Sequence, residues 1–130
     1  ANTAWAFATA GCATAEAAPR RLFLKMAEGA AKKMATFKQQ ELANIVWAYA
    51  KAGVSAPTLF EAAALELPRA VEECSPQGLS NVAWAFAKAG FSAPPVFEAV
   101  AEESVRRAAV CKPQDLTNIV WAFSTAGFAA

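Results

Sequence analysis

Three asparagines recur at a fixed spacing, and their side chains are the groups in this chain best suited to binding a ligand. Asn44, Asn81 and Asn118 are each 37 residues apart, and lysine or threonine follows each of them seven positions later. A side-chain amide offers donors and an acceptor, and lysine offers a charge that pairs with phosphate. With the glutamines near the start of the same segments, the candidate binding residues are Gln40, Asn44, Lys51, Gln77, Asn81, Lys88, Gln114, Asn118 and Thr125.

Two interpretations of the asparagines remain open at this point. In modular proteins that bind single strands, one helical repeat addresses one base through two or three side chains. The change from Thr9 to Lys51, Lys88 and Thr125 is what a surface contacting successive units of a polymer would show. The alternative is a hydrogen-bonded ladder between neighbouring helices, because an amide in an apolar helix is costly unless it is paired.

The residue types give little indication of a catalytic site or a metal site. The chain has no histidine, and Cys12, Cys74 and Cys111 show no Cys-x-x-Cys spacing. Cys74 and Cys111 occupy the position that Phe37 fills one unit earlier, so we interpret them as small hydrophobic residues and expect all three cysteines to be reduced. We therefore expect no enzymatic activity, no catalytic residue, no metal site, no cofactor and no small-molecule substrate.

The asparagines lie inside a phrase that recurs along the chain. It runs Leu-Ala-Asn-Ile-Val-Trp-Ala-Tyr-Ala-Lys-Ala-Gly over 42–53 and returns with few changes over 79–90 and 116–127. A shortened copy opens the chain, with Trp5 placed 42 residues before Trp47, so five extra residues lie within 12–21. We interpret the chain as one array, a fragment of a longer one, with repeats at about 1–38, 39–75, 76–112 and, in part, 113–130.

Each repeat is expected to contain two helices, called A and B. Proline at a first helical position, serine before it and glycine just past the end delimit them, as Ser75, Pro76 and Gly90 illustrate. Pro68 is expected to kink or shorten its helix. The predicted A helices are 1–10, 39–52, 76–89 and 113–126, and the predicted B helices are 19–35, 57–73 and 94–110.

The apolar pattern predicts how these helices pack. Each A helix is apolar on two sides, which indicates a helix between neighbours, with its tryptophan in the core. Each B helix has one apolar stripe, formed by Phe23, Met26, Ala30 and Met34, by Phe60, Ala64, Leu67 and Val71, and by Phe97, Val100, Ser104 or Val105, and Ala108. Its charges are expected to form a solvated face, including Lys25, Lys32, Lys33, Glu61, Arg69, Glu72, Glu73, Glu98, Glu102, Glu103, Arg106 and Arg107. The predicted fold is all-α, an α-solenoid of helical hairpins with a 37-residue period and about three and a half repeats.

Composition limits the classes of partner. Hydrophobic residues make up 56% of the chain, which excludes disorder, and the net charge of +1 provides no global attraction to nucleic acid or to an anionic membrane. Polar residues interrupt the apolar stretches before they reach the roughly 18–20 residues of a membrane span. We expect no membrane insertion.

The phrase Leu-x-Asn-x-x-Trp-Ala-aromatic-Ala-Lys-Ala-Gly, preceded by Pro76-Gln77-Gly78 and Pro113-Gln114-Asp115, resembles the octotricopeptide repeat and the related heptatricopeptide repeat. The resemblance covers essentially the whole chain. It implies a helical-hairpin protein of chloroplasts, or less readily of mitochondria, that binds single-stranded organellar RNA and controls its translation, processing or stability. The alternative it allows is a structural scaffold that contacts protein subunits of a large organellar complex, such as a ribosome or a membrane-protein assembly.

Overall fold

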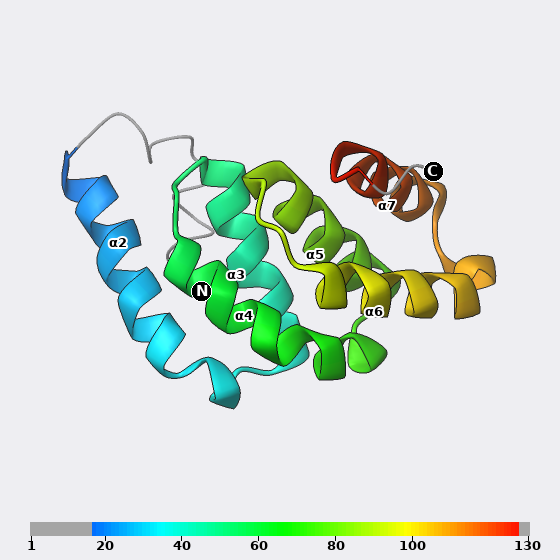
Figure 1. The fold of residues 1–130 in the computed structure, drawn as a ribbon, viewed down its shortest axis with the longest axis horizontal. Coiled ribbons are helices and arrows are strands. Elements are labelled where there is room, and N and C mark those ends of the chain that lie inside the picture. The colour runs from blue at the N-terminus through cyan, green and yellow to red at the C-terminus, as the bar shows by residue number, and fades with distance from the viewer. Residues whose placement is uncertain (1–16, 128–130) are drawn as a thin grey trace.

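The computed structural model describes residues 17–127, and their regular secondary structure is entirely helical (Figure 1). This part has no strand, so the predicted all-α class is confirmed for it. The predicted helix at 1–10, together with Trp5, Thr9 and Cys12, lies outside the described residues. The elements are α2 (Ala17–Lys32), η1 (Met34–Thr36), α3 (Gln39–Ala52), α4 (Pro57–Ala70), η2 (Val71–Glu73), α5 (Pro76–Ala89), α6 (Pro94–Arg106), η3 (Ala108–Val110) and α7 (Pro113–Thr125).

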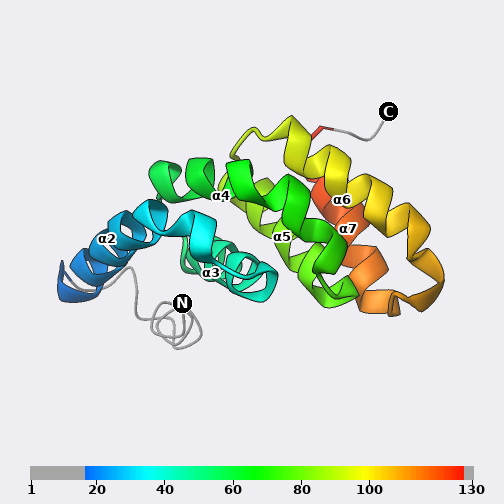
Figure 2. The same ribbon diagram turned by 90° about the horizontal axis from the view of Figure 1, so that it is seen from below.

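The helices form two layers (Figure 2). The A helices α3, α5 and α7 lie side by side in chain order, with α5 packed against both of the others. The B helices α2, α4 and α6 form the second layer, in which α4 contacts both α2 and α6. Consecutive helices also pack across the layers, α3 on α4 and α5 on α6. The core therefore lies between the layers and between neighbours within each layer.

Local sequence accounts for the limits of the A helices. The Ser75 hydroxyl accepts a hydrogen bond from the Gly78 N–H at 3.0 Å, and Pro76 begins α5, as predicted. Gly53 and Gly90 end α3 and α5 with φ values of 71° and 69°, a left-handed conformation that a residue without a Cβ adopts at little cost. The predicted limits 39–52 and 76–89 match the observed helices, and α7 ends one residue before the predicted limit.

The B helices end earlier than predicted. Each one gives way to a short 3₁₀ turn, beginning at Met34, Val71 or Ala108. Pro68 lies within α4, but α4 has 14 residues against 13 for α6, which contains no proline at that point. The prediction that Pro68 shortens its helix is therefore wrong, because the same turn ends α6 without it.

One aromatic pair connects each B helix to the A helix that comes next in the chain. Phe23 meets Tyr49, Phe60 meets Phe86 and Phe97 meets Phe123, with ring centroids 5.1–5.2 Å apart and interplanar angles of 74–87°. This edge-to-face geometry is the favoured arrangement of two aromatic rings. The contacts fix which side of each A helix faces the B layer.

Some residues of the predicted B-helix stripe are not buried. Met26 is 45% exposed and Val105 is 79% exposed, and Ala108 is exposed as well, whereas Ser104 is partly buried. The equivalents of Met26 are Ala63 and Val100, which are fully buried in helices that have a B helix before them. Among the described residues α2 has no B helix before it and α6 has none after it, so these positions lack a neighbour.

Two charged residues that we predicted to be solvated form a clamp between hairpins. Glu103 is buried and forms ion pairs with Arg106 and with Arg107, the latter at 3.2 Å. The Arg107 guanidinium also donates hydrogen bonds to the carbonyl oxygens of Cys74 at 2.6 Å and Val71 at 3.2 Å. The prediction of a solvated role is wrong for Glu103 and Arg107, because the Arg107 guanidinium reaches the carbonyl groups at the two ends of η2 and holds the Glu103 carboxylate beside it.

Tyr49 has the one hydroxyl among these three aromatic pairs. It is fully buried, and its hydroxyl donates to the Phe23 carbonyl oxygen at 2.6 Å. Burial raises the pKa of Tyr49 from 10.0 to about 12. The folded protein therefore keeps this proton in a pH range where the unfolded chain releases it, so the stabilisation is complete below pH 10 and is lost as the pH rises toward 12.

Replacing Tyr49 by phenylalanine is expected to lower the free energy of unfolding by about 1 kcal/mol at neutral pH, because one buried hydrogen bond is lost. Phe86 occupies the equivalent place in α5, so the ring itself fits. The variant should also lose less stability than the wild type between pH 10 and pH 12. Urea denaturation at several pH values measures both effects, and an equal alkaline loss in the two proteins would contradict the assignment.

Replacing Arg107 by alanine is expected to lower the free energy of unfolding by about 2 kcal/mol, because two charged hydrogen bonds and an ion pair disappear. Arg106→Ala is the matched control, since its side chain is 66% exposed and its ion pair should contribute less than about 1 kcal/mol. Chemical denaturation of both variants makes the comparison. Equal losses would show that Arg107 is an ordinary surface arginine.

Candidate ligand-binding face

One side of each A helix carries a glutamine, an asparagine, a tryptophan and a lysine or threonine. In α3 these are Gln40, Asn44, Trp47 and Lys51, spaced so that all four lie on one side of the helix. The same positions in α5 and α7 are Gln77, Asn81, Trp84 and Lys88, and Gln114, Asn118, Trp121 and Thr125. We call this surface the A-face.

Every predicted site residue lies on the A-face. The three glutamines, the two lysines and Thr125 are exposed, and the three asparagines are partly buried. The alanines that follow the asparagines by four residues, Ala48, Ala85 and Ala122, are fully buried. The structure therefore brings the nine predicted residues together across three neighbouring helices.

The tryptophans belong to the A-face and not to the centre of the core. Trp121 is 43% exposed, and Trp47 and Trp84 are only partly buried while still packing against the core. Trp84 stands between the other two, with ring centroids 6.5 Å from Trp47 and 6.3 Å from Trp121. The prediction of a core position is wrong for Trp121, because none of the other described helices covers the side of the A layer that faces away from the B helices, whereas Trp47 and Trp84 lie at the edge of the core.

The spacing of the residues in the sequence indicates that the tryptophans share a helix side with the asparagines and lysines. The tryptophan follows the asparagine by three residues and precedes the lysine by four, which places all three on one side of a helix. Lys51 shows the proximity directly, since its ammonium nitrogen lies 6.0 Å from the centroid of the Trp47 ring. That distance is within the range of a cation–π contact.

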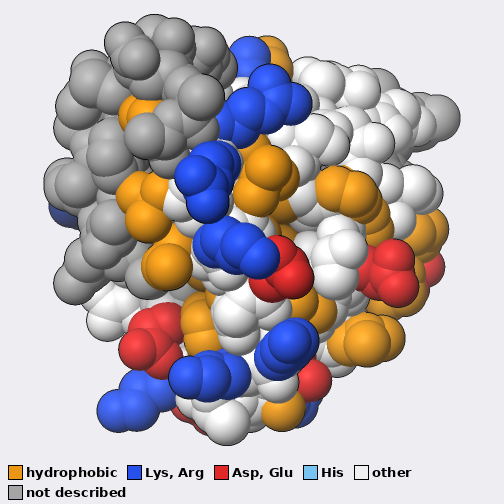
Figure 3. All heavy atoms as spheres, turned by 90° about the vertical axis from the view of Figure 1, so that its left-hand side faces the viewer, with side chains coloured by type: hydrophobic (Ala, Val, Ile, Leu, Met, Phe, Trp, Pro, Cys, Tyr) orange, Lys and Arg blue, Asp and Glu red, His pale blue; other side chains and the backbone are white. Residues whose placement is uncertain are grey.

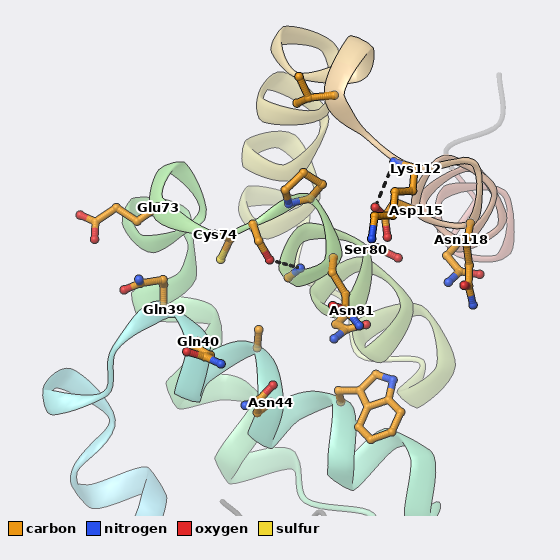
Figure 4. A pocket seen from close by; sticks show the side chains of 18 residues that line it. Gln39, Gln40, Asn44, Glu73, Cys74, Ser80, Asn81, Lys112, Asp115 and Asn118 are labelled. Carbon is orange, nitrogen blue, oxygen red and sulfur yellow. Dashed lines mark hydrogen bonds between the residues drawn. The ribbon is translucent and has the colours of Figure 1, made fainter.

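A groove of about 960 Å³ crosses the N-terminal halves of the A helices (Figure 4). Amide side chains from three helices line it, and Figure 4 shows Asn44, Asn81 and Asn118 around the open space. Its charged lining residues are Glu73, Lys112 and Asp115. The groove is therefore rich in neutral hydrogen-bonding groups and has no excess of positive charge.

The asparagine side chains form no hydrogen bond with any other described residue. A ladder between Asn44, Asn81 and Asn118 would need such bonds, and none connects them in residues 17–127. Because the three amides are only partly buried, water can satisfy them in the absence of a ligand. Their donors and acceptors remain available to a molecule in the groove.

Positive charge is concentrated at one end of the molecule. Figure 3 faces the α2 end and shows lysine and arginine side chains running down it. The segment 17–38 has a single acidic residue, Glu28, and six basic ones, which are Arg20, Arg21, Lys25, Lys32, Lys33 and Lys38. All six basic side chains are exposed. The near-neutral total thus conceals a basic end, of which the sequence analysis named only Lys25, Lys32 and Lys33, as solvated surface.

Cys74 has the character of a buried hydrophobic residue, and Cys111 is partly buried. Cys74 and Cys111 are both free, as predicted, while Cys12 is outside the described residues. Burial raises the pKa of the Cys74 thiol to about 11, which keeps it protonated and unreactive. Residues 17–127 contain no group of three or more metal-ligating side chains placed to hold an ion.

The chain matches no known family model, and no curated protein is significantly similar to it. Within the described part, no helix combines the length and the apolar character needed to cross a membrane. The A-face is therefore interpreted from its own chemistry.

Replacing Asn81 by alanine is expected to change the free energy of unfolding by less than about 0.5 kcal/mol, because its amide has no hydrogen-bond partner among the described residues. Thermal unfolding followed by circular dichroism measures the effect. The exposed residue Glu61 provides a control position, through Glu61→Gln. A loss above about 1 kcal/mol for Asn81→Ala would restore the hydrogen-bonded ladder.

Proposed function

We propose that this chain is a segment of an α-solenoid of helical hairpins, repeating every 37 residues, that binds single-stranded RNA along its A-face. The layered packing of α2 to α7 supports the solenoid, as does the 37-residue spacing between the starts of α3, α5 and α7 and between those of α4 and α6. The proposal includes the setting that the repeat phrase implies, which is organellar gene expression in a chloroplast or, second, a mitochondrion. The module acts by binding and not by catalysis.

The observation that carries the RNA proposal is the row of tryptophans beside rows of amides and lysines on one surface. Single-strand binding proteins combine aromatic side chains on which bases stack with cations that contact the backbone. Trp47, Trp84 and Trp121 provide the aromatic row, and Lys51 and Lys88 lie one helical turn further along the same side. The amides can then hydrogen-bond to base edges.

The number of cations sets the expected strength. Two lysines that neutralise two phosphates give a slope of about −1.4 in log K against log salt for a single strand. Affinity should then fall only about sevenfold between 50 and 200 mM salt. A steeper slope would indicate that the basic end around α2 also contacts the strand.

The second candidate function is a scaffold for protein partners in a large organellar complex. Its support is the exposed apolar side chains of the B helices, where Leu65 in α4 and Val105 in α6 are each 79% exposed. Such residues on a protein surface are common at protein interfaces when they form a contiguous patch. RNA binding predicts that substitutions in the A layer weaken binding, whereas a scaffold function predicts that substitutions in the B layer do so.

Replacing Lys51 and Lys88 together by alanine is expected to weaken RNA binding and to bring the salt slope close to zero, because both proposed phosphate contacts are removed. Stability should be unchanged, since both side chains are exposed. Fluorescence anisotropy with a labelled single-stranded RNA over a range of salt concentrations measures the affinity.

Arg69→Ala together with Arg106→Ala is the matched control, since it removes two exposed cations from the B layer. An unchanged affinity in the lysine variant, together with loss of partner assembly when the B layer is altered, would favour the scaffold and reject RNA binding.

A further inference from the structure

The A-face presents the same side chains at each of its three described helices. Glutamine, asparagine and tryptophan each occur three times at equivalent positions, and only the fourth position varies, as Lys51, Lys88 and Thr125. The rows are regular in space, since successive tryptophan rings are 6.5 and 6.3 Å apart. A polymer that crosses the helices therefore meets the same groups at each step.

The two acidic side chains that distinguish the starts of α3 and α7 from that of α5 are occupied in capping their own helices. The carboxylates of Glu41 and Asp115 accept hydrogen bonds from the backbone N–H groups of Lys38 at 2.9 Å and Lys112 at 3.2 Å. In α5 the equivalent residue is Gly78, and its N–H donates to the Ser75 hydroxyl. The carboxylates of Glu41 and Asp115 thus cap helices and are not free to distinguish one base from another.

Recognition of a mixed sequence requires different side chains in successive repeats, since each repeat addresses one base. Identical side chains make identical contacts. From these observations, and resting on the proposed RNA-binding function, we infer that the A-face binds a run of adenine nucleotides in single-stranded RNA. Each A helix would contact one base.

The amide chemistry selects adenine. Asparagine and glutamine form bidentate hydrogen bonds with adenine, whose N6 donor and N7 acceptor match the acceptor and donor of the amide, whereas guanine favours arginine or lysine. In each helix the asparagine stands three residues before the tryptophan, so a base stacked on the indole would present its edge to the amide. Lys51 and Lys88, one turn beyond the tryptophans, are then placed for the phosphates.

The test compares labelled RNA strands of equal length, made of adenine only, of uracil only, of cytosine only, and of a mixed sequence. Fluorescence anisotropy with the 130-residue chain at 50 mM salt gives their affinities. We expect the adenine strand to bind at least about fivefold more tightly than the uracil and cytosine strands, which corresponds to about 1 kcal/mol, the low end of the range for one bidentate contact. The mixed strand should fall between them.

Two variants assign the preference to the A-face. Asn81→Ala should reduce the ratio of adenine to uracil affinity, while Trp121→Ala should weaken all strands, because stacking is tolerant of base identity. Glu61→Gln on the B layer should change neither the ratio of adenine to uracil affinity nor the overall affinity. Circular dichroism verifies that each variant is folded.

The possible failures are distinct. Equal affinity for all four strands, a mixed strand that binds most tightly, or an Asn81→Ala variant that keeps the full adenine preference would each overturn the inference and leave RNA binding intact. Absence of binding to every strand would overturn the proposed function as well.

Discussion

The edge-to-face contact between each B helix and the following A helix is the interaction on which the arrangement depends. It recurs at Phe23 with Tyr49, Phe60 with Phe86, and Phe97 with Phe123, each time with nearly the same centroid distance. The partners are 26 residues apart in each case. Because a B helix ends one unit and the following A helix begins the next, the contact joins successive units. Because edge-to-face packing is directional, it sets the rotation of the A helix as well as its position.

That rotation has a consequence for the opposite side of the A layer. With one side of α3, α5 and α7 held toward the B helices, the residues on the far side lie in rows along the layer. The tryptophan rings are the clearest case, and the asparagines form a second row about one helical turn before them in the chain. A surface of repeated chemistry is thus a product of core packing, even though its side chains contribute little to the core.

Polar contacts between hairpins are less regular than apolar ones. Arg107 joins α6 to the carbonyl groups of Val71 and Cys74, but the equivalent residues in the earlier units are Ala70 and Lys33, which make no such contact. Glu103 and Arg107, two of the positions for which the sequence analysis failed, are of this kind. A glutamate and an arginine on a predicted surface stripe give no sign that carbonyl groups of a neighbouring turn lie within hydrogen-bonding reach of the arginine.

The sequence by itself determined the helices and most of the side chains that form the candidate face. Ser75, Pro76, Gly53 and Gly90 act on the backbone within one or two turns, so their effects do not depend on distant contacts. Only the tertiary structure decided how far Trp47, Trp84 and Trp121 are covered, and that Glu103 is buried. An apolar side chain prefers burial wherever a neighbour exists, but the neighbours come from other helices, so its final exposure is a property of the packed layers and not of its own segment.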